Sequence, residues 1–249
     1  MSATLDASLR RRLVALARQD ALLAFDFDGT LAPIVSEPGR AALPETTRAL
    51  LSALAARRRC AVLSGRALDD LRARLAGLPL VALVGNHGLE IAGEPSPEGL
   101  RAGVHAWSAE LAERLAHLPG VRIEDKGLTL SVHFRGAPAP ERAEAEIRAA
   151  ADELHGARVF GGKAVVNVAP QGAPDKGDAL AALLAVAPTP AALYVGDDET
   201  DEPAFALAPE APVLGLRVGP AAATRAEHVL PDRELMDAVL DALIEGASA

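Results

Sequence analysis

Short apolar runs alternate along the chain with longer segments whose apolar residues recur at helical spacing. The runs that we predict as strands of the main sheet are Leu22–Phe27, Cys60–Leu63, Leu80–Val84, Ala191–Val195 and Val213–Val218. Helices are predicted at the amphipathic N-terminus, after Pro44, and at Ala67–Ala76, Lys176–Val186, Glu202–Leu207 and Glu234–Ile244. This alternation is typical of an α/β protein with a mainly parallel sheet.

The pattern changes between two linkers rich in glycine and proline, one after Ile91 and one near Gly172. The segment between these linkers predicts a compact module in which helices and pairs of strands alternate. Its elements are expected at Val104–His117, Val121–Glu124, Leu128–Phe134, Glu141–Leu154, Arg158–Phe160 and Ala164–Val168. We therefore expect one α/β core, residues 1–96 and 173–249, divided by an inserted α+β module at 97–172.

Composition narrows the possible partners. The chain has 249 residues, of which 50% are hydrophobic and 24% charged, so it can bury a large core. Its net charge of −9 and its aromatic content of 3% argue against nucleic acids and anionic membranes as partners. The single cysteine, Cys60, excludes an intrachain disulfide and a cysteine zinc cluster.

The distribution of charged residues bears on the compartment. No long uncharged apolar stretch predicts a transmembrane helix, and the N-terminal segment lacks the apolar stretch of a signal peptide. We therefore expect a cytoplasmic protein. The oligomeric state stays open, with a monomer favoured.

Polar residues that can carry chemistry lie at or just after the carboxyl ends of several predicted strands. They are Asp26, Asp28, Gly29, Thr30, Ser64, Asp197 and Asp198, and Lys176 begins a later helix. In an open parallel sheet, ligands bind beyond the carboxyl ends of the strands, so these side chains are expected at one edge. Asp26, Asp28 and Asp197 would form an all-oxygen cation site of the type that Mg²⁺ prefers.

Such a site is suited to phosphoryl transfer. A cation offsets the repulsion between carboxylates and holds a phosphate oxygen. One aspartate can attack phosphorus to form an aspartyl-phosphate, while the second protonates the leaving oxygen and then activates water. The hydroxyls of Thr30 and Ser64 and the ammonium of Lys176 would position the phosphate. The alternative, a solvated acidic turn after the first strand, does not explain the order and placement of the other motifs.

In their order along the chain, these motifs resemble those of the haloacid dehalogenase-like superfamily. The motifs are Asp26-x-Asp28-Gly29-Thr30, Ser64, Lys176 and Gly196-Asp197-Asp198. The resemblance implies a Rossmann-like core in which Asp26 is the nucleophile and Asp28 the general acid and base. Ser64 and Lys176 would bind the phosphate. The resemblance also implies Mg²⁺ as the cofactor, held by Asp26, the main-chain carbonyl of Asp28 and Asp197, with Asp198 close by.

The position of the inserted module indicates a phosphatase. The short segment between Asp26 and Ser64 leaves no room for a module, whereas the longer one between Ser64 and Lys176 accommodates it. A module in this second position is typical of sugar-phosphate phosphatases of the superfamily, where it closes over the site as a cap. The presence of Asp28 argues against a dehalogenase, and the position of the cap argues against a phosphomutase.

Further strings are similar to the trehalose-6-phosphate phosphatase family. They are Phe27–Ile34, Gly85–Glu90, the segment from Glu124 through Arg135, and Gly196–Glu202. The resemblance implies hydrolysis of trehalose 6-phosphate to trehalose and inorganic phosphate, and thus a small sugar phosphate as the partner. The substrate-binding candidates are Thr30, Gly65, Arg66, Asn86, His87, Glu90, Lys126, His133, Arg135, Asn167 and Asp201.

Several of these candidates also have purely structural interpretations. Lys126 can belong to a turn between two strands of the module. His133 and Arg135 alternate along a strand and can both lie on its solvated face. Asn86 and His87 can satisfy backbone groups of their own loop. The sequence leaves these interpretations open.

The last predicted strand of the module departs from the family pattern. It has Asn167 and Ala169 where many family members carry a glutamate and a basic residue. An amide accepts hydrogen bonds from sugar hydroxyls more weakly than a carboxylate does. A phosphatase for a related glycoside phosphate, such as a mannosyl- or glucosyl-glycerate phosphate, is therefore the alternative. A non-catalytic sugar-phosphate sensor is a further one, which the presence of Asp26 and Asp28 disfavours.

Overall fold

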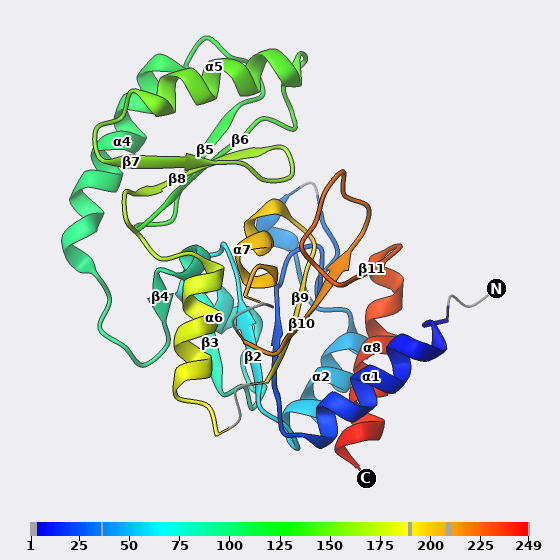
Figure 1. Ribbon diagram of the computed structural model, residues 1–249. Helices are drawn as coiled ribbons and strands as arrows, with labels where there is room; N and C mark the ends of the chain where they lie inside the picture. The colour runs from blue at the N-terminus through cyan, green and yellow to red at the C-terminus, as the bar shows by residue number, and fades with distance from the viewer. Residues whose placement is uncertain (1–3, 36, 189–190, 208–210, 249) are drawn as a thin grey trace.

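The structure is a computed structural model that describes residues 4–35, 37–188, 191–207 and 211–248. Within these residues the main sheet has seven strands in the order β11-β10-β9-β1-β2-β3-β4 (Figure 1). The strands are β1 Leu22–Phe25, β2 Cys60–Leu63, β3 Ala82–Gly85, β4 Glu90–Ile91, β9 Ala192–Gly196, β10 Val213–Val218 and β11 His228–Leu230. All neighbouring pairs are parallel except β3 with β4, which confirms the predicted α/β class.

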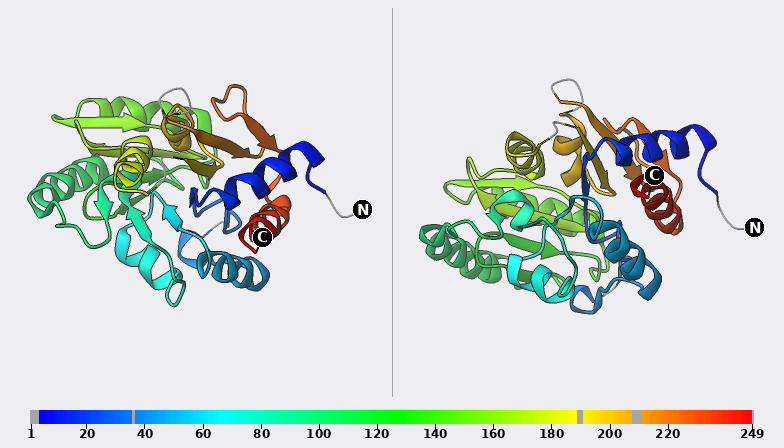
Figure 2. Two further views of the ribbon diagram at one scale, coloured as in Figure 1. Left: turned by 60° about the horizontal axis from the view of Figure 1, so that its bottom comes forward. Right: turned by 90° about the horizontal axis from the view of Figure 1, so that it is seen from below.

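Helices cover both faces of this sheet. The first face is covered by α1 Ala7–Arg18, α2 Glu45–Ala55, α3 Leu68–Arg74 and α8 Met236–Ala247, the second by α6 Lys176–Ala185 and α7 Glu202–Phe205. Side chains of β1 alternate between the two apolar layers, because Leu23 and Phe25 belong to the first and Leu22 and Ala24 to the second. Figure 2 shows α1 and α8, in blue and red, packed side by side.

The strand order determines where a ligand can bind. β1 lies between β2 and β9, so the chain leaves β1 in one direction across the sheet and later returns on its other side. The carboxyl ends of these three strands are therefore neighbours at the switch point of the sheet, where open α/β sheets bind ligands. Asp26, Ser64 and Asp197 each follow one of them.

Residues 97–172, which we call the cap, contain a second, antiparallel sheet in the order β5-β6-β8-β7. We call the rest of the chain the core. The elements of the cap are α4 Arg101–Arg114, β5 Arg122–Asp125, β6 Leu130–His133, α5 Pro140–Asp152, β7 Ala157–Phe160 and β8 Val165–Pro170. Val104, Val132 and Ile147 belong to the apolar cluster that joins the two helices to this sheet. Figure 1 shows α4 and α5 on the side away from the core, so the other face of the cap sheet is turned toward the core.

Some elements differ from those predicted. β1 ends at Phe25, two residues before the predicted end, because the chain turns at Gly29, whose φ of +86° favours glycine. The sequence analysis missed β4 and β11, since strands of two or three residues carry too little apolar pattern. It also missed the 3₁₀ helices η1 Pro38–Arg40, η2 Asn86–Gly88, η3 Glu98–Leu100, η4 Glu199–Asp201 and η5 Arg233–Leu235. None of the described helices has the length and apolar character that crossing a lipid bilayer would require.

Candidate active site

The turn after β1 begins at Asp26 and passes close to Asp197. The backbone N–H of Asp26 donates to the carbonyl of Val195 in β9 (2.8 Å), so Asp26 still follows the sheet register. The N–H of Gly29 then donates to the carbonyl of Ala32 (2.7 Å) and closes a tight turn. A Cβ atom on Gly29 would lie 2.0 Å from Oδ2 of Asp197. Only glycine therefore allows the Asp197 carboxylate to approach the turn this closely.

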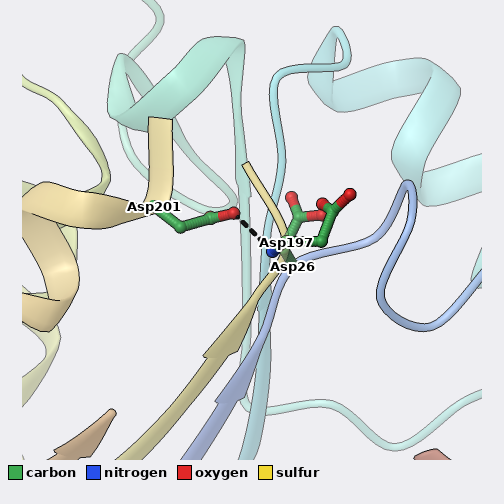
Figure 3. A group of neighbouring side chains, drawn as sticks. All are labelled: Asp26, Asp197 and Asp201. Carbon is green, nitrogen blue, oxygen red and sulfur yellow. Dashed lines mark hydrogen bonds between the residues drawn. The ribbon is translucent and has the colours of Figure 1, made fainter. Parts of the chain in front are cut away.

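Asp26, Asp197 and Asp201 form an acidic group in which one oxygen from each residue lies within 4.8 Å of the others (Figure 3). The oxygens of Asp201 are already engaged. Its Oδ1 accepts hydrogen bonds from Lys176 Nζ and the Tyr194 hydroxyl, both at 2.7 Å. Its Oδ2 accepts the N–H groups that follow β9, those of Asp197 and Asp198, both at 2.9 Å. Asp201 therefore holds Lys176 and the backbone of Asp197 and Asp198 in place and has no oxygen left without a partner.

The other two carboxylates suit a metal ion. Burial raises the pKa of Asp26 well above its ordinary value, and burial likewise raises the pKa of Asp197 to about 7. The charge of Asp201 adds to both shifts. A dication would offset this repulsion, and carboxylate oxygens are the ligands that Mg²⁺ prefers. The donor set fits magnesium, and Asp26 and Asp197 are the side chains that would hold it.

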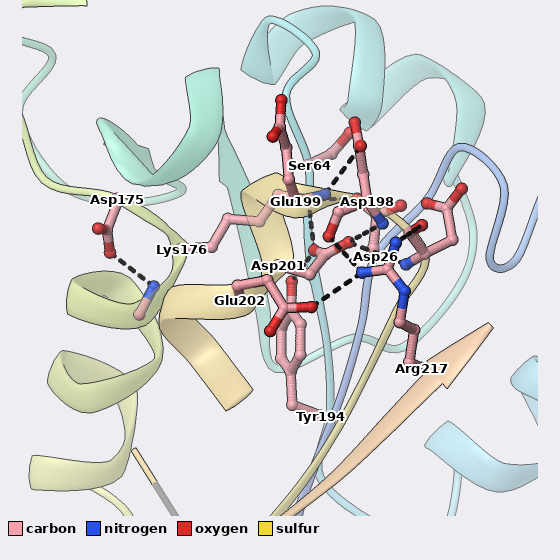
Figure 4. Close-up of polar contacts among 12 residues, drawn as sticks. Asp26, Ser64, Asp175, Lys176, Tyr194, Asp198, Glu199, Asp201, Glu202 and Arg217 are labelled. Atoms are coloured by element: carbon pink, nitrogen blue, oxygen red, sulfur yellow. Dashed lines mark hydrogen bonds and ion pairs between the residues drawn. The ribbon is translucent and has the colours of Figure 1, made fainter. Parts of the chain in front are cut away.

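The position of Lys176 follows from the way α6 begins. Asp175 caps this helix, because its Oδ1 accepts the N–H groups of Gly177 (2.8 Å) and Asp178 (3.0 Å) (Figure 4). Lys176 is thus the first helical residue, and its buried ammonium lies 2.7 Å from Oδ1 of Asp26. Burial opposes the charge of Lys176, but the carboxylates of Asp201 and Asp26 prevail and raise its pKa above the ordinary value.

Arg217, a residue that the sequence analysis missed, holds the loop after β9. Its guanidinium donates to the carbonyls of Asp197 and Asp198, both at 3.0 Å, and to Glu202 at 2.9 Å (Figure 4). An arginine within the apolar strand Val213–Val218 was the available signal. Asp198 itself caps η4 by accepting the Glu199 N–H at 2.8 Å. The structure thus places the Asp198 carboxylate in a capping position, outside the acidic group.

Asp28 belongs to the same turn, and an arginine orients it. The Arg66 guanidinium donates to both carboxylate oxygens of Asp28, at 2.6 and 2.7 Å. Arg66 also donates to Asp70 (2.7 Å) and to the carbonyl of Pro38 (2.8 Å), so it is firmly fixed. The buried Ser64 accepts the backbone N–H of Arg66 at 3.2 Å. These contacts give Arg66 a role in orienting Asp28.

A cavity of about 390 Å³ lies between core and cap and collects most of the predicted site residues. The predicted residues that line it are Asp26, Asp28, Ser64, Gly65, Arg66, His87, Lys126, His133, Arg135, Asn167, Lys176, Asp197 and Asp198. Four predicted residues are not among its lining: Thr30, Asn86, Glu90 and Asp201. Asn86 is buried and bonded to Glu90 (2.6 Å) and Thr129 (2.6 Å), and Thr30 is fully buried.

The cap contributes charged groups to this cavity. Lys126 donates to the carbonyl of Gly65 at 2.8 Å, and burial lowers the pKa of this lysine to about 8. His133 bonds Glu124 at 2.7 Å, and this hydrogen bond is the main reason why the pKa of Glu124 falls to about 2. The cap therefore brings a lysine and a histidine–glutamate pair to the cavity.

His87 contacts the cap from the core, whereas Asn167 forms its hydrogen bonds within the cap. The His87 backbone has a φ of +60°, and its buried ring meets Phe160 of the cap edge-on at 5.1 Å. Asn167 accepts a hydrogen bond from Ser131 (2.6 Å) and donates to the carbonyl of Gly161 (3.1 Å). The amide of Asn167 thus fixes a cap loop in addition to lining the cavity.

The sequence is similar to those of known phosphatases. A sequence model of the trehalose-phosphatase family matches residues 24–229. A trehalose-phosphate phosphatase of Mycobacterium tuberculosis is 38% identical over 207 residues, which cover 76% of this chain and 51% of that relative. The chain therefore spans about half the length of the curated relatives it matches.

Solved structures agree in fold. The C-terminal domain of a Candida albicans trehalose-6-phosphate phosphatase has a TM-score of 0.84 at 22% identity, over 98% of this chain and 99% of that one. An Aspergillus fumigatus trehalose-6-phosphate phosphatase has a TM-score of 0.63 at 27% identity, again over 98% and 99%. Because the family model matches most of the sequence, including the residues that line the cavity, this chain belongs to the trehalose-phosphatase family.

Proposed function

We propose that the protein is a Mg²⁺-dependent phosphatase that hydrolyses trehalose 6-phosphate through an aspartyl-phosphate on Asp26. The observation that carries this proposal is the meeting of Asp26, Asp28, Lys176 and Asp197 at one cavity beneath a cap. The family match and the names of the relatives support the phosphatase activity and the choice of substrate.

Asp26 is the proposed nucleophile. The Lys176 ammonium at 2.7 Å holds one carboxylate oxygen and orients the other for attack on phosphorus. As the bond from Asp26 to phosphorus forms, the bond from phosphorus to the sugar oxygen breaks. When bound at Asp26 and Asp197, Mg²⁺ supplies positive charge that neutralises the phosphate. The hydroxyl of Ser64 and the ammonium of Lys176 bind the same phosphate.

Asp28 is the proposed general acid and base. Its proton passes to the departing sugar oxygen, and the resulting carboxylate then takes a proton from the water that hydrolyses the aspartyl-phosphate. The two hydrogen bonds from Arg66 keep this carboxylate directed into the cavity. The hydrolysis step releases inorganic phosphate and restores Asp26.

Phosphate release from a panel of sugar phosphates tests the proposal. We expect turnover of trehalose 6-phosphate with Mg²⁺ and none with EDTA. Asp26→Asn should lower kcat by at least about a thousandfold, because it removes the nucleophile. Asp28→Asn should slow sugar phosphates more than aryl phosphates, whose leaving groups require less protonation. No release from any member of the panel would reject the enzyme in favour of a sensor.

The panel also decides which sugar phosphate is the substrate. The side chain of Asn167, a candidate for binding the sugar, already forms hydrogen bonds with Ser131 and Gly161, so it does not by itself identify the sugar. Mannosyl- and glucosyl-glycerate phosphates therefore belong in the panel beside trehalose 6-phosphate. Turnover of either of these without turnover of trehalose 6-phosphate would transfer the assignment to that glycoside phosphate.

A further inference from the structure

The chain contains three lysines, Lys126, Lys163 and Lys176, and all three line the cavity. The sequence analysis did not single out Lys163, and the proposed mechanism does not use it. Lys163 lies in the cap between β7 and β8, and its ammonium contacts Oδ2 of Asp197 in the core. A side chain of the cap thus pairs with a carboxylate that we propose as a magnesium ligand.

The loop that carries Lys163 lies directly on the core. A Cβ atom on Gly161 would lie 1.8 Å from Oε1 of Glu199, and one on Gly162 would lie 2.9 Å from Oδ2 of Asp198. The absence of side chains at both glycines therefore permits the close approach. The backbone N–H of Lys163 also donates to Oδ2 of Asp198 at 3.3 Å. Main chain and side chain together hold this cap loop, residues 161–163, against the carboxyl end of β9.

The two partners of the ion pair differ in their freedom to move. The side chain of Asp197 is 3% exposed, and that of Lys163 is 41% exposed. Arg217 holds the carbonyl of Asp197 and Asp201 holds its N–H. Lysine, in contrast, has a long flexible stem that can carry its ammonium toward solvent. A second cation that arrives at Asp197 therefore displaces the lysine and leaves the carboxylate in place.

We propose that Lys163 is a tethered cation that competes with Mg²⁺ for Asp197, so that metal binding breaks one of the contacts that hold cap loop 161–163 against the core. The proposal rests on the magnesium site of the proposed function. Two cations on one buried carboxylate repel each other strongly, because the surroundings screen charge poorly. Lys163 thereby lowers the affinity for the metal and links metal occupancy to the contact between cap and core.

Calorimetric titration with Mg²⁺ alone, without substrate, tests the competition. Lys163→Gln removes the competing charge and should tighten Mg²⁺ binding at least about fivefold. Lys163→Arg keeps the charge and serves as the matched control, with an affinity close to that of the unmodified protein. Asp197→Asn removes the shared carboxylate and should weaken Mg²⁺ binding strongly. Thermal unfolding of each variant checks that it is folded.

Hydrogen exchange of cap loop 161–163 provides the second measurement. Mg²⁺ should speed exchange of the Lys163 amide in the unmodified protein, because loss of the ion pair loosens the loop that the hydrogen bond to Asp198 still holds. In Lys163→Gln this amide should exchange faster than in the unmodified protein without Mg²⁺, and Mg²⁺ should change its rate little. Equal Mg²⁺ affinity of the glutamine variant, or no response of the loop to Mg²⁺, would overturn the proposal. If Asp197→Asn binds Mg²⁺ as well as the unmodified protein does, the magnesium site itself is wrong and the competition fails with it.

Discussion

Lys176 and Lys126 meet different partners, and their pKa values shift in opposite directions. Lys176 lies between two carboxylates, which raise its pKa despite burial. Lys126 is half-buried and donates to a neutral carbonyl, that of Gly65, and burial lowers its pKa to about 8. The same side chain is therefore a permanent cation at one wall of the cavity and a titratable group at the other.

A pH profile follows from the position of Lys126. If its ammonium binds the substrate, kcat/KM should fall as the pH rises through about 8, because the amine then loses its proton. Lys126→Met should have a lower kcat/KM that no longer declines in this range, whereas Lys126→Arg keeps its charge and should show no decline there. An unchanged decline in Lys126→Met would assign the titration to another group.

At the scale of single elements, the start of α6 sets the geometry of the site. Asp175 caps the helix, and the carboxylate of Asp178 in turn accepts a hydrogen bond from the Asp175 N–H at 3.0 Å. These two reciprocal contacts fix the first turn of α6, whose first residue is Lys176. Local sequence thus positions the ammonium that holds Asp26, the proposed nucleophile.

Asp175→Ala should therefore affect both stability and activity. We expect the free energy of unfolding to fall by about 1 kcal/mol, since two N–H groups lose their acceptor. The rate of phosphate release should fall as well, because Lys176 loses its fixed starting point. Asp178→Ala leaves the main cap in place and should change less in both respects. Urea denaturation and phosphate release provide the two measurements, and equal effects of both substitutions would contradict this reasoning.

At the scale of the whole molecule, the cap meets the core through a small number of polar contacts around the cavity. Thr129 of the cap donates to Oδ1 of Asn86 in the core at 2.6 Å, and both residues are buried. Lys126 and Lys163 reach the core at Gly65 and Asp197. The volume available to a substrate therefore depends on contacts between parts of the chain that are distant in sequence.

Thr129→Val tests the buried contact between cap and core. The change keeps the shape of the side chain but leaves the Asn86 oxygen without this donor, which should lower the free energy of unfolding by about 1–3 kcal/mol. We also expect KM to rise, because the cap closes less firmly over the substrate. Thr129→Ser keeps the hydroxyl and should behave much more like the unmodified protein. Denaturation and steady-state kinetics measure both effects, and a valine variant with unchanged stability would contradict the role of the hydrogen bond.

Much of the fold could be predicted because neighbouring residues encode it. Cys60–Leu63 and Val213–Val218 are strands with the predicted bounds, since continuous apolar runs bounded by turns specify buried strands. β11, in contrast, is specified by its pairing with β10, which a local pattern does not record. The sequence also predicted Asp26, Ser64 and Asp197 near the carboxyl ends of strands, and the strand order brings these positions together.

By itself, then, the sequence determined the parallel sheet, the inserted module and the acidic motifs, because periodicity and short motifs are local properties of the chain. Only the tertiary structure decided which of the carboxylates are free to act. Asp201 is saturated by its partners, Asp198 caps a helix, and Lys163 reaches Asp197 from the cap. The contacts of Lys176 with Asp201 and of Lys163 with Asp197 join residues that lie 25 and 34 positions apart in the sequence, and such contacts exist only once the chain has folded.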